Sequence, residues 1–509
     1  MNNVKVPAPL STLLALALCG AALPAHGAPA AGLEQIHTVV VLVGENRSFD
    51  NLYGLFPGAN GIAQALEQNA AAQRDRDGSL MATLPPVWKK ESKKADNTAS
   101  NKVRNAARET APAVADPHFP KDMPNAPFRI DGAPINLPLS KNTRDLVHRH
   151  YQNQMQINGG KNDMFVAYSD AGALTMGYYD GAQLPMWHIA RQYTLADNFF
   201  MGAFGGSYIN HMWLACACTP RMEGAHGTPQ FEHELHLRAK PDSPAKAADG
   251  PPRLFDSDYT PDGYTINTVQ PTYQPSKSAP ARGGDPAYAD PKAPDVLPPQ
   301  TMKTIGDVMS DKAVSWAWYA GGFKRALADH KQVYGGDIDF QTHHQPFNYF
   351  LRYAPGTPAR AQHLRDGAEL FADIAKGTLP QVAFYKPQGT LNEHPGTADV
   401  IAGDMHLADI VARLQASPQW AHMAIIVTYD ENGGFWDHVA PPKGDRWGPG
   451  SRIPAIIISP YAKRGFIDHT VYDTTSILQF LTHRFGLETL PGIRTQFGDL
   501  SNAFDFGAH

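Results

Sequence analysis

The chain has 509 residues, of which 42% are hydrophobic and 18% charged, a composition typical of a globular protein and not of a disordered one. Its formal net charge of −5 leaves no broad basic field for a nucleic-acid backbone, so we expect no nucleic-acid partner. There are 21 histidines. Imidazole binds metals and donates to phosphate oxygens near neutral pH, so this surplus favours such chemistry.

The N-terminus has the pattern of a secretory signal. Lys5 is followed by an apolar run (LSTLLALAL) and then by small residues. We therefore predict a signal peptide at residues 1–27, a mature start near Ala28 and a periplasmic or secreted protein. The run is too short for a stable membrane anchor. The alternative is a lipoprotein attached at Cys19, although the bulky Leu18 stands where such sites have a small residue.

Residues 28–509 are predicted to form a single domain with surface excursions near 61–125 and 240–300. Both excursions are rich in Ala, Asp and Pro and lack a helical or strand period. The second is expected to contribute no regular core element. One interpretation is that it forms a rim over the binding pocket.

Apolar runs alternate with helical patterns along the chain. The run HTVVVLV at 37–43 is β-branched throughout, which is typical of a strand buried on both faces of a parallel sheet. Further strands are predicted at 313–319, 381–385, 424–428 and 453–459, with a strand or loop at 194–201. Helices are predicted at 145–156, 186–193, 208–218, 304–310, 371–376, 406–416 and 474–485. This alternation predicts an α/β fold with a mainly parallel sheet.

Two of these strands end in acidic residues. Glu45 and Asn46 follow the first strand, and Asp430 and Glu431 follow the strand at 424–428. Ligands of open α/β sheets bind beyond the carboxyl ends of the strands, where these side chains would converge. Each carboxylate pair at ~4 Å would repel by about 4 kcal/mol at an effective dielectric of roughly 20, so convergence would call for a cation. The alternative, that each acid caps a nearby helix, explains two clusters less well than one divalent or other hard metal ion does.

Ser207 is a candidate nucleophile. It follows Gly205 and Gly206, which let a substrate approach the backbone closely, and it precedes a helix whose N-terminus suits an anion. A metal would activate its hydroxyl group. The alternative is an ordinary helix N-cap, and the sequence alone does not separate the two.

Several histidines lie in polar loops that follow strands. His343 and His344 occupy one such loop, His394 lies in a turn after the strand at 381–385, and His438 follows Asp437. A lone histidine is more often structural, but several together favour a cluster that donates to phosphoryl oxygens.

Only Cys216 and Cys218 remain after the predicted cleavage. Two residues apart, they are expected not to form a disulfide with each other. We interpret them as small buried thiols of an apolar helix (MWLACAC), with a C-x-C metal motif as the alternative.

Six segments together resemble the acid phosphatase / phosphatidylcholine-type phospholipase C superfamily of bacterial phosphoesterases: VVVLVGENRSFDNLYG, NGGKNDMF, DNFFMGAFGGSYINH, HHQPFNYF, NEHPG and TYDENGGFWDHVAPP. The resemblance implies an alkaline-phosphatase-like three-layer α/β/α core with a mainly parallel sheet and a smaller appended region. It implies a phosphoseryl intermediate on Ser207. It also implies a metal held by Glu45, Asn46, Ser207, Asp430 and Glu431.

The same resemblance implies that His148, His344 and His394 hold the phosphoryl group, with His343 and Asp437 near them. His150 and His118 are the alternatives to His148. The Gly-Gly-Ser207 setting, NGGKND and HHQPFNY are more similar to the acid phosphatase branch.

The expected function is therefore that of an exported, metal-dependent phosphomonoesterase. The alternative is a phospholipase C-type phosphodiesterase, so the expected substrate is a phosphoester small molecule or a phospholipid. A binding protein that retains an inactive esterase fold, and a sulfatase or phosphonate hydrolase on the same core, also remain open.

Overall fold

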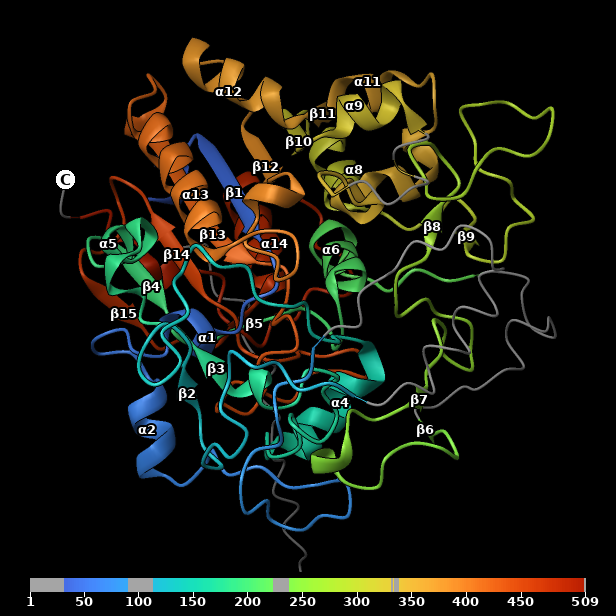
Figure 1. The fold of residues 1–509 in the computed structure, drawn as a ribbon. Coiled ribbons are helices and arrows are strands. Elements are labelled where there is room, and N and C mark those ends of the chain that lie inside the picture. The colour runs from blue at the N-terminus through green and yellow to red at the C-terminus, as the bar shows by residue number, and fades with distance from the viewer. Residues whose placement is uncertain (1–31, 90–112, 223–237, 331–332, 334–337, 508–509) are drawn as a thin grey trace, which may run out of the picture.

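The computed structural model describes residues 32–89, 113–222, 238–330, 333 and 338–507. The predicted signal peptide at 1–27 lies outside the described residues. The centre of the molecule is an eight-stranded sheet (Figure 1). Within the described ranges, no helix has both the length and the apolar character needed to cross a membrane.

The sheet is mainly parallel. In spatial order its strands are β11 (Leu364–Asp366), β10 (Trp316–Ala320), β12 (Val382–Lys386), β1 (Thr38–Gly44), β13 (Met423–Tyr429), β14 (Ala455–Ile458), β4 (Thr194–Ala196) and β15 (Phe466–Asp468). Strand β1 pairs in parallel with both β12 and β13, so that Val41 lies between Phe384 and Ile426. Only β14 runs antiparallel to its neighbours in this sheet. The predicted α/β class with a mainly parallel sheet is confirmed.

Helices cover both faces of the sheet. The helices of the described residues are α1 (Phe49–Tyr53), α2 (Ile62–Glu67), α4 (His150–Ile157), α5 (Pro185–Ala190), α6 (Ser207–Cys216), α8 (Ile305–Asp311), α9 (Phe323–Ala328), α11 (Pro358–His363), α12 (Gly367–Lys376), α13 (Val400–Gln415) and α14 (Thr474–Phe485), not all of which lie on the sheet. α5, α12 and α13 pack as one group, and α6, α8 and α14 as another. Every residue of β1 and β13 is buried, as expected of strands covered on both faces.

Four pairs of two-residue strands lie outside the main sheet: β2 (Phe128–Arg129) with β3 (Gly177–Tyr178), β5 (Phe199–Phe200) with β16 (Tyr472–Asp473), β6 (Arg238–Ala239) with β7 (Leu254–Phe255), and β8 (Gln270–Pro271) with β9 (Val296–Leu297). The last two pairs belong to the excursion near 240–300, drawn in yellow-green in Figure 1. As expected, this excursion adds no strand to the main sheet. It is held to α6 by Thr265, whose hydroxyl lies 2.8 Å from that of Tyr208.

The helix predicted at 145–156 is too long at its N-terminal end, because α4 begins at His150. Backbone N–H groups in this region donate to distant side chains instead of starting a helix. Val147 donates to Asp170 Oδ1 over 2.8 Å, and His150 donates to Asn267 Oδ1 over 3.2 Å. Conversely, α13 begins before the predicted residue 406, because the Asp399 side chain caps it by accepting from Ala402 N.

Cys216 and Cys218 form a disulfide, so the expectation of two free thiols is wrong. Cys216 is the last residue of α6, and Ala217 takes a left-handed conformation with φ 47° and ψ 41°. This turn folds the chain back on itself and brings the two Cα atoms to 5.1 Å, within the usual range for a disulfide. The bond also removes the alternative of a C-x-C metal motif.

Candidate active site

The predicted acidic strand ends converge at the carboxyl edge of the sheet. β1 and β13 are neighbours, and Asn46 N donates to Asp430 Oδ1 over 3.1 Å. Arg47 N donates to the backbone oxygen of Glu431 over 3.0 Å. The parallel pairing of the strands therefore places both acidic segments on one site.

Asn46 lies two residues after the end of β1, where the backbone changes direction toward the site. Its φ of 64° lies in the left-handed region, which asparagine tolerates better than most residues. Its side-chain Oδ1 accepts from Ser207 Oγ over 3.2 Å, and its Nδ2 lies 3.4 Å from His148 Nε2. Asn46 thus links an acidic strand end to the candidate nucleophile.

Ser207 is the first residue of α6, and its side chain faces the acids. Its hydroxyl lies within donating distance of Asn46 Oδ1 and of Glu431 Oε1, the latter at 3.3 Å. The N-cap of the helix is Gly206, so the interpretation of Ser207 as an ordinary N-cap is wrong. A Cβ on Gly206 would lie 2.6 Å from the backbone oxygen of His148, which explains why glycine is needed there.

A cavity of about 360 Å³ opens onto this cluster. Its wall is formed by Glu45, Asp145, Leu146, Val147, His148, Arg149, Asp170, Gly206, Ser207, Tyr208, Ile266, Asn267, Thr268, Gln341, His343 and His394. Ile266, Asn267 and Thr268 belong to the excursion near 240–300. The structure thus agrees with the interpretation of that excursion as part of the pocket rim.

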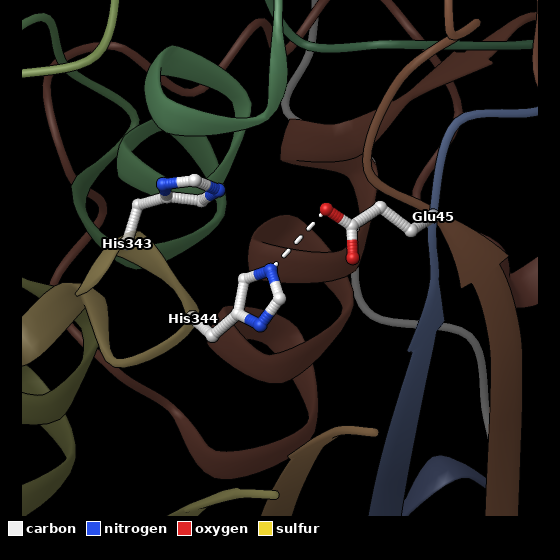
Figure 2. Close-up of side chains that lie close together, drawn as sticks. All are labelled: Glu45, His343 and His344. Carbon is white, nitrogen blue, oxygen red and sulfur yellow. Dashed lines mark hydrogen bonds and ion pairs between the residues drawn. The ribbon is translucent and has the colours of Figure 1, made fainter. Parts of the chain in front are cut away.

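Two neighbouring histidines face Glu45 across the site (Figure 2). His344 Nε2 lies 3.2 Å from Glu45 Oε1, and all three side chains are buried. Neither ring nitrogen of His343 has a hydrogen-bond partner within the described part of the chain. Burial lowers the pKa of both histidines, and for His344 it does so despite the opposing charge of Glu45. Both rings are therefore favoured as neutral groups in the free protein.

His148 and His394 face the site from another side of the cavity. His148 Nδ1 donates to Leu146 O over 2.6 Å, and His394 Nδ1 donates to Pro395 O over 2.6 Å. These bonds leave both Nε2 atoms toward the acids, with His148 Nε2 3.7 Å from Glu431 Oε1 and His394 Nε2 4.0 Å from Glu45 Oε1.

The environment of His148 favours its charged form. Burial disfavours that form, but the nearby carboxylates of Glu431 and Asp145 outweigh the effect and raise the pKa of His148 to about 9. His150 instead bonds to Phe204 O from the interior, and His118 is exposed beside Asp116. Of the three candidates, the structure therefore brings only His148 to the wall of the cavity.

The site concentrates buried negative charge. Glu45, Asp430 and Glu431 are each at most 5% exposed. Burial raises the pKa of Glu45, but His344 and Lys386 outweigh it and hold that pKa well below its usual range. Burial is the main cause that raises the pKa of Glu431 to about 8, with His148 opposing it. Three carboxylates beside an amide oxygen and a hydroxyl are a hard-oxygen donor set, which fits Mg²⁺, Ca²⁺ or Mn²⁺.

Asp437 lies in a different cluster. Its carboxylate accepts from Arg452 Nε over 3.0 Å and from Asp50 N over 3.0 Å. His438 Nδ1 lies 2.7 Å from Asp50 Oδ2 in the same group. Among the described residues, no hydrogen bond of Asp437 reaches the histidines of the cavity, so the structure does not bring it together with the other predicted site residues.

Three residues of the site are missing from the sequence-based prediction. Asn392 Nδ2 donates to Glu45 Oε2, Lys386 Nζ lies between two of the acids, and His211 Nδ1 donates to the backbone oxygen of Ser207 over 2.7 Å. The position of each residue in the sequence, next to a predicted element or site residue, could have identified it. Lys386 directly follows the strand predicted at 381–385, Asn392 belongs to the same NEHPG segment as His394, and His211 lies four residues after Ser207 on the predicted helix.

The chain is similar to curated phospholipases C. It is 25% identical over 527 aligned residues to phospholipase C B of Mycobacterium tuberculosis, which covers 95% of this chain and 81% of the relative. It is 24% identical to the non-hemolytic phospholipase C of Pseudomonas aeruginosa, covering 95% of this chain and 59% of the relative. A shorter match of 37% identity to non-specific phospholipase C1 of Arabidopsis thaliana covers 18% of this chain and 20% of the relative.

Solved structures with a similar chain path are more distant. A protein in the alkaline phosphatase superfamily from Vibrio parahaemolyticus has a TM-score of 0.31 and 10% identity, over 73% of this chain and 75% of that chain. The lipoteichoic acid synthase LtaP from Listeria monocytogenes has a TM-score of 0.31 and 9% identity, over 71% of this chain and 74% of that chain.

The model of the Phosphoesterase family matches residues 36–488, which include both acidic strand ends, Ser207 and the three histidines that line the cavity. The protein is thus a hydrolase that acts on phosphoric ester bonds. The chain belongs to the Phosphoesterase family.

Proposed function

We propose that this protein is an exported, metal-dependent phosphodiesterase of the phospholipase C type, which releases the phosphorylated headgroup of a phospholipid. The observation that carries the proposal is the match to proteins named phospholipase C over 95% of this chain. The cavity is consistent with it. Beside the charged cluster, Leu146, Val147 and Ile266 give its wall an apolar part.

In the proposed reaction, Ser207 is the nucleophile. Ser207 loses its hydroxyl proton to solvent water, and its Oγ forms a bond to phosphorus while the bond from phosphorus to the glycerol oxygen breaks, which leaves a phosphodiester on Ser207 and a diacylglycerol alkoxide. The alkoxide takes a proton from a histidine. His148 is the candidate donor, because its pKa of about 9 keeps it charged at neutral pH. Water then attacks phosphorus while the bond from phosphorus to Ser207 Oγ breaks. The neutral His148 takes a proton from this water, and Ser207 Oγ takes one from solvent, so the headgroup phosphate is released and both residues are restored.

The remaining histidines are proposed to hold the phosphoryl oxygens. His343 and His394 line the cavity, and His344 lies beside Glu45. Donors fixed before the reaction stabilise developing charge without reorganisation. Glu45, Asn46, Asp430 and Glu431, with the Ser207 hydroxyl, would hold one hard divalent ion. When bound, that ion would lower the pKa of the hydroxyl group and offset the phosphoryl charge.

A phosphomonoesterase is the second candidate. The observation that favours it is the Gly-Gly-Ser207 setting at the start of α6, which is more similar to the acid phosphatase branch. The two candidates differ in whether the bound phosphoryl group carries one or two ester substituents.

Three substrates separate these functions: phosphatidylcholine in mixed micelles, p-nitrophenyl phosphorylcholine and p-nitrophenyl phosphate. We expect kcat/KM for both diesters to exceed that for the monoester by about 100-fold or more, with all three activities lost in Ser207→Ala. Preference for the monoester would assign the protein to the acid phosphatase branch instead.

Export is proposed from the N-terminal signal pattern and supported by the Cys216–Cys218 disulfide, because disulfides persist mainly outside the reducing cytosol. The test is to express the full chain in a bacterial host and determine the N-terminus of the protein recovered from the periplasm or medium. A start near Ala28 is expected. Recovery of only the uncleaved chain from the cytosol would contradict export.

A further inference from the structure

Lys386 is a buried cation at the centre of the acidic cluster. It is the last residue of β12, the neighbour of β1 in the sheet, and its side chain is 0% exposed. Its Nζ donates to Gly44 O over 2.9 Å. The same nitrogen lies 3.4 Å from Glu45 Oε2 and 3.4 Å from Asp430 Oδ2. One ammonium group thus contacts the acidic ends of both β1 and β13.

A fully buried lysine is costly, so its charge must be compensated by its surroundings. An ammonium group removed from water is strongly unfavourable unless opposite charges and hydrogen bonds compensate for it, and here they do. The two acids also need the lysine. Glu45 and Asp430 are buried close together, and their carboxylates repel each other unless a cation lies between them. Lys386 supplies that charge from the protein itself.

We propose that Lys386 is a positioning residue of the metal site, a fixed cation that holds Glu45 and Asp430 together before an ion binds and limits the site to one divalent ion. The inference rests on the proposed function, in which Glu45, Asp430 and Glu431 bind the metal. With an ion bound, Glu45, Asp430 and Glu431 would all be ionised. The ammonium would offset one of their three negative charges, and a single divalent ion would neutralise the other two.

The Lys386 ammonium also disfavours a second metal ion beside Glu45. Glu45, His343 and His344 offer three ligand atoms within 4.8 Å of one another, which by itself would suit a metal. However, the Lys386 ammonium already lies 3.4 Å from the other oxygen of the same carboxylate. A further cation there would meet a positive charge in a buried environment, where repulsion is weakly screened.

The Lys386 ammonium affects the stability of the ion-free protein and the affinity for the ion in opposite directions. Lys386 stabilises the ion-free protein, in which its ammonium group is a counter-charge shared by Glu45 and Asp430. It stabilises the ion-bound protein less, because the bound ion and the ammonium repel each other. Removing the ammonium should therefore destabilise the ion-free protein and tighten ion binding.

The experiment uses the full chain, stripped of metal with a chelator and titrated with Mn²⁺ by calorimetry at pH 8, with thermal unfolding measured with and without Mn²⁺. Wild type is compared with Lys386→Met, which keeps the length of the side chain, and with Lys376→Met at an exposed position of α12 as the matched control. Wild type and K376M should bind one Mn²⁺ alike. K386M should bind one Mn²⁺ with a Kd lower by about tenfold. It should also have a lower Tm without ion and a larger rise in Tm on adding Mn²⁺.

Unchanged or weaker Mn²⁺ binding by K386M, or two Mn²⁺ ions bound by wild type, would overturn the role of Lys386 alone. Binding of no ion by wild type would overturn the metal dependence in the proposed function as well. If K386M does not fold, the double variant K386M/D430N is measured instead. It removes the ammonium and one of the two carboxylates that the ammonium contacts, and we expect it to fold. Failure of the double variant to regain a folded state would count against charge compensation as the role of Lys386.

Discussion

Ser207 Oγ lies 3.3 Å from Glu431 Oε1, although 224 residues separate the two in the chain. The contact joins the first turn of α6 to the loop after β13. A serine hydroxyl directed at a buried carboxylate, and not at the backbone of its own helix, has little structural purpose that alanine could not replace.

Ser207→Ala should therefore abolish turnover while leaving the fold intact. We expect kcat to fall by about 1,000-fold or more, because the substitution removes the oxygen that attacks phosphorus. Thermal unfolding should match that of wild type, since the N-cap of α6 is Gly206. Turnover within tenfold of wild type would contradict the assignment of Ser207 as nucleophile.

His148→Gln tests whether a protonated histidine gives a proton to the leaving alkoxide. Because Glu431 and Asp145 keep His148 protonated at neutral pH, its loss removes a positive group from the phosphoryl site. We expect kcat/KM to fall by about 100-fold or more. The control is His118→Gln, at an exposed position beside Asp116, which should retain wild-type kinetics. Equal losses in both variants would show that the effect is not specific to His148.

The sequence was sufficient to predict the sheet and the acidic half of the site. Strands β1 and β13 are buried on both faces, and that burial is visible as uninterrupted apolar runs. Glu45 and Asp430 then follow from a general rule, because the carboxyl ends of parallel strands meet at one edge. At these positions the apolar pattern of the sequence is enough to predict where the strands and the acids lie in the fold.

The features that the sequence did not reveal depend on contacts between distant segments. His148 is held in an extended segment, because Val147 N donates to Asp170, which no local pattern shows. The contacts of Lys386 depend on β12 lying next to β1 in the sheet. The disulfide depends on the left-handed turn at Ala217, whereas the expectation of free thiols considered only the spacing of the cysteines.

Asp437→Asn should lower stability more than it lowers activity. Asp437 pairs with the buried Arg452 and accepts from Asp50 N, so the change weakens a buried ionic cluster outside the cavity wall. We expect the free energy of unfolding to fall by about 2–3 kcal/mol, with kcat of the folded protein within a few-fold of wild type. Denaturant unfolding and initial rates measure the two effects. Unchanged stability with a kcat loss like that of S207A would instead place Asp437 in the catalytic machinery.

Asn267→Ala tests the contribution of the excursion near 240–300 to substrate binding. Asn267 lines the cavity and fixes the rim, because its Oδ1 accepts from His150 N and its Nδ2 donates to Ser257 O over 2.7 Å. Loss of these bonds should loosen the rim without altering Ser207. We expect KM for the soluble diester to rise by about tenfold, with kcat nearly unchanged. A fall in kcat at constant KM would contradict a role in substrate binding.

Glu393→Gln should change how stability depends on pH. Glu393 is fully buried, and its Oε1 accepts from the Tyr429 hydroxyl over 2.9 Å. Burial, with the nearby Asp404 adding to it, raises the pKa of Glu393 from 4.5 to about 8. The folded state therefore binds more protons than the unfolded state between these pH values, so this residue makes the protein less stable as pH rises through that window.

Glutamine keeps the shape of Glu393 and cannot ionise. Relative to wild type, E393Q should gain more than about 2 kcal/mol of unfolding free energy between pH 5 and pH 8.5, as measured by denaturant unfolding. Glu67→Gln, at an exposed position of α2, is the matched control and should show no such gain. If E393Q and wild type instead changed in parallel across this range, Glu393 would be ionised in the folded protein at pH 5, and its burial would have to be compensated by a positive charge.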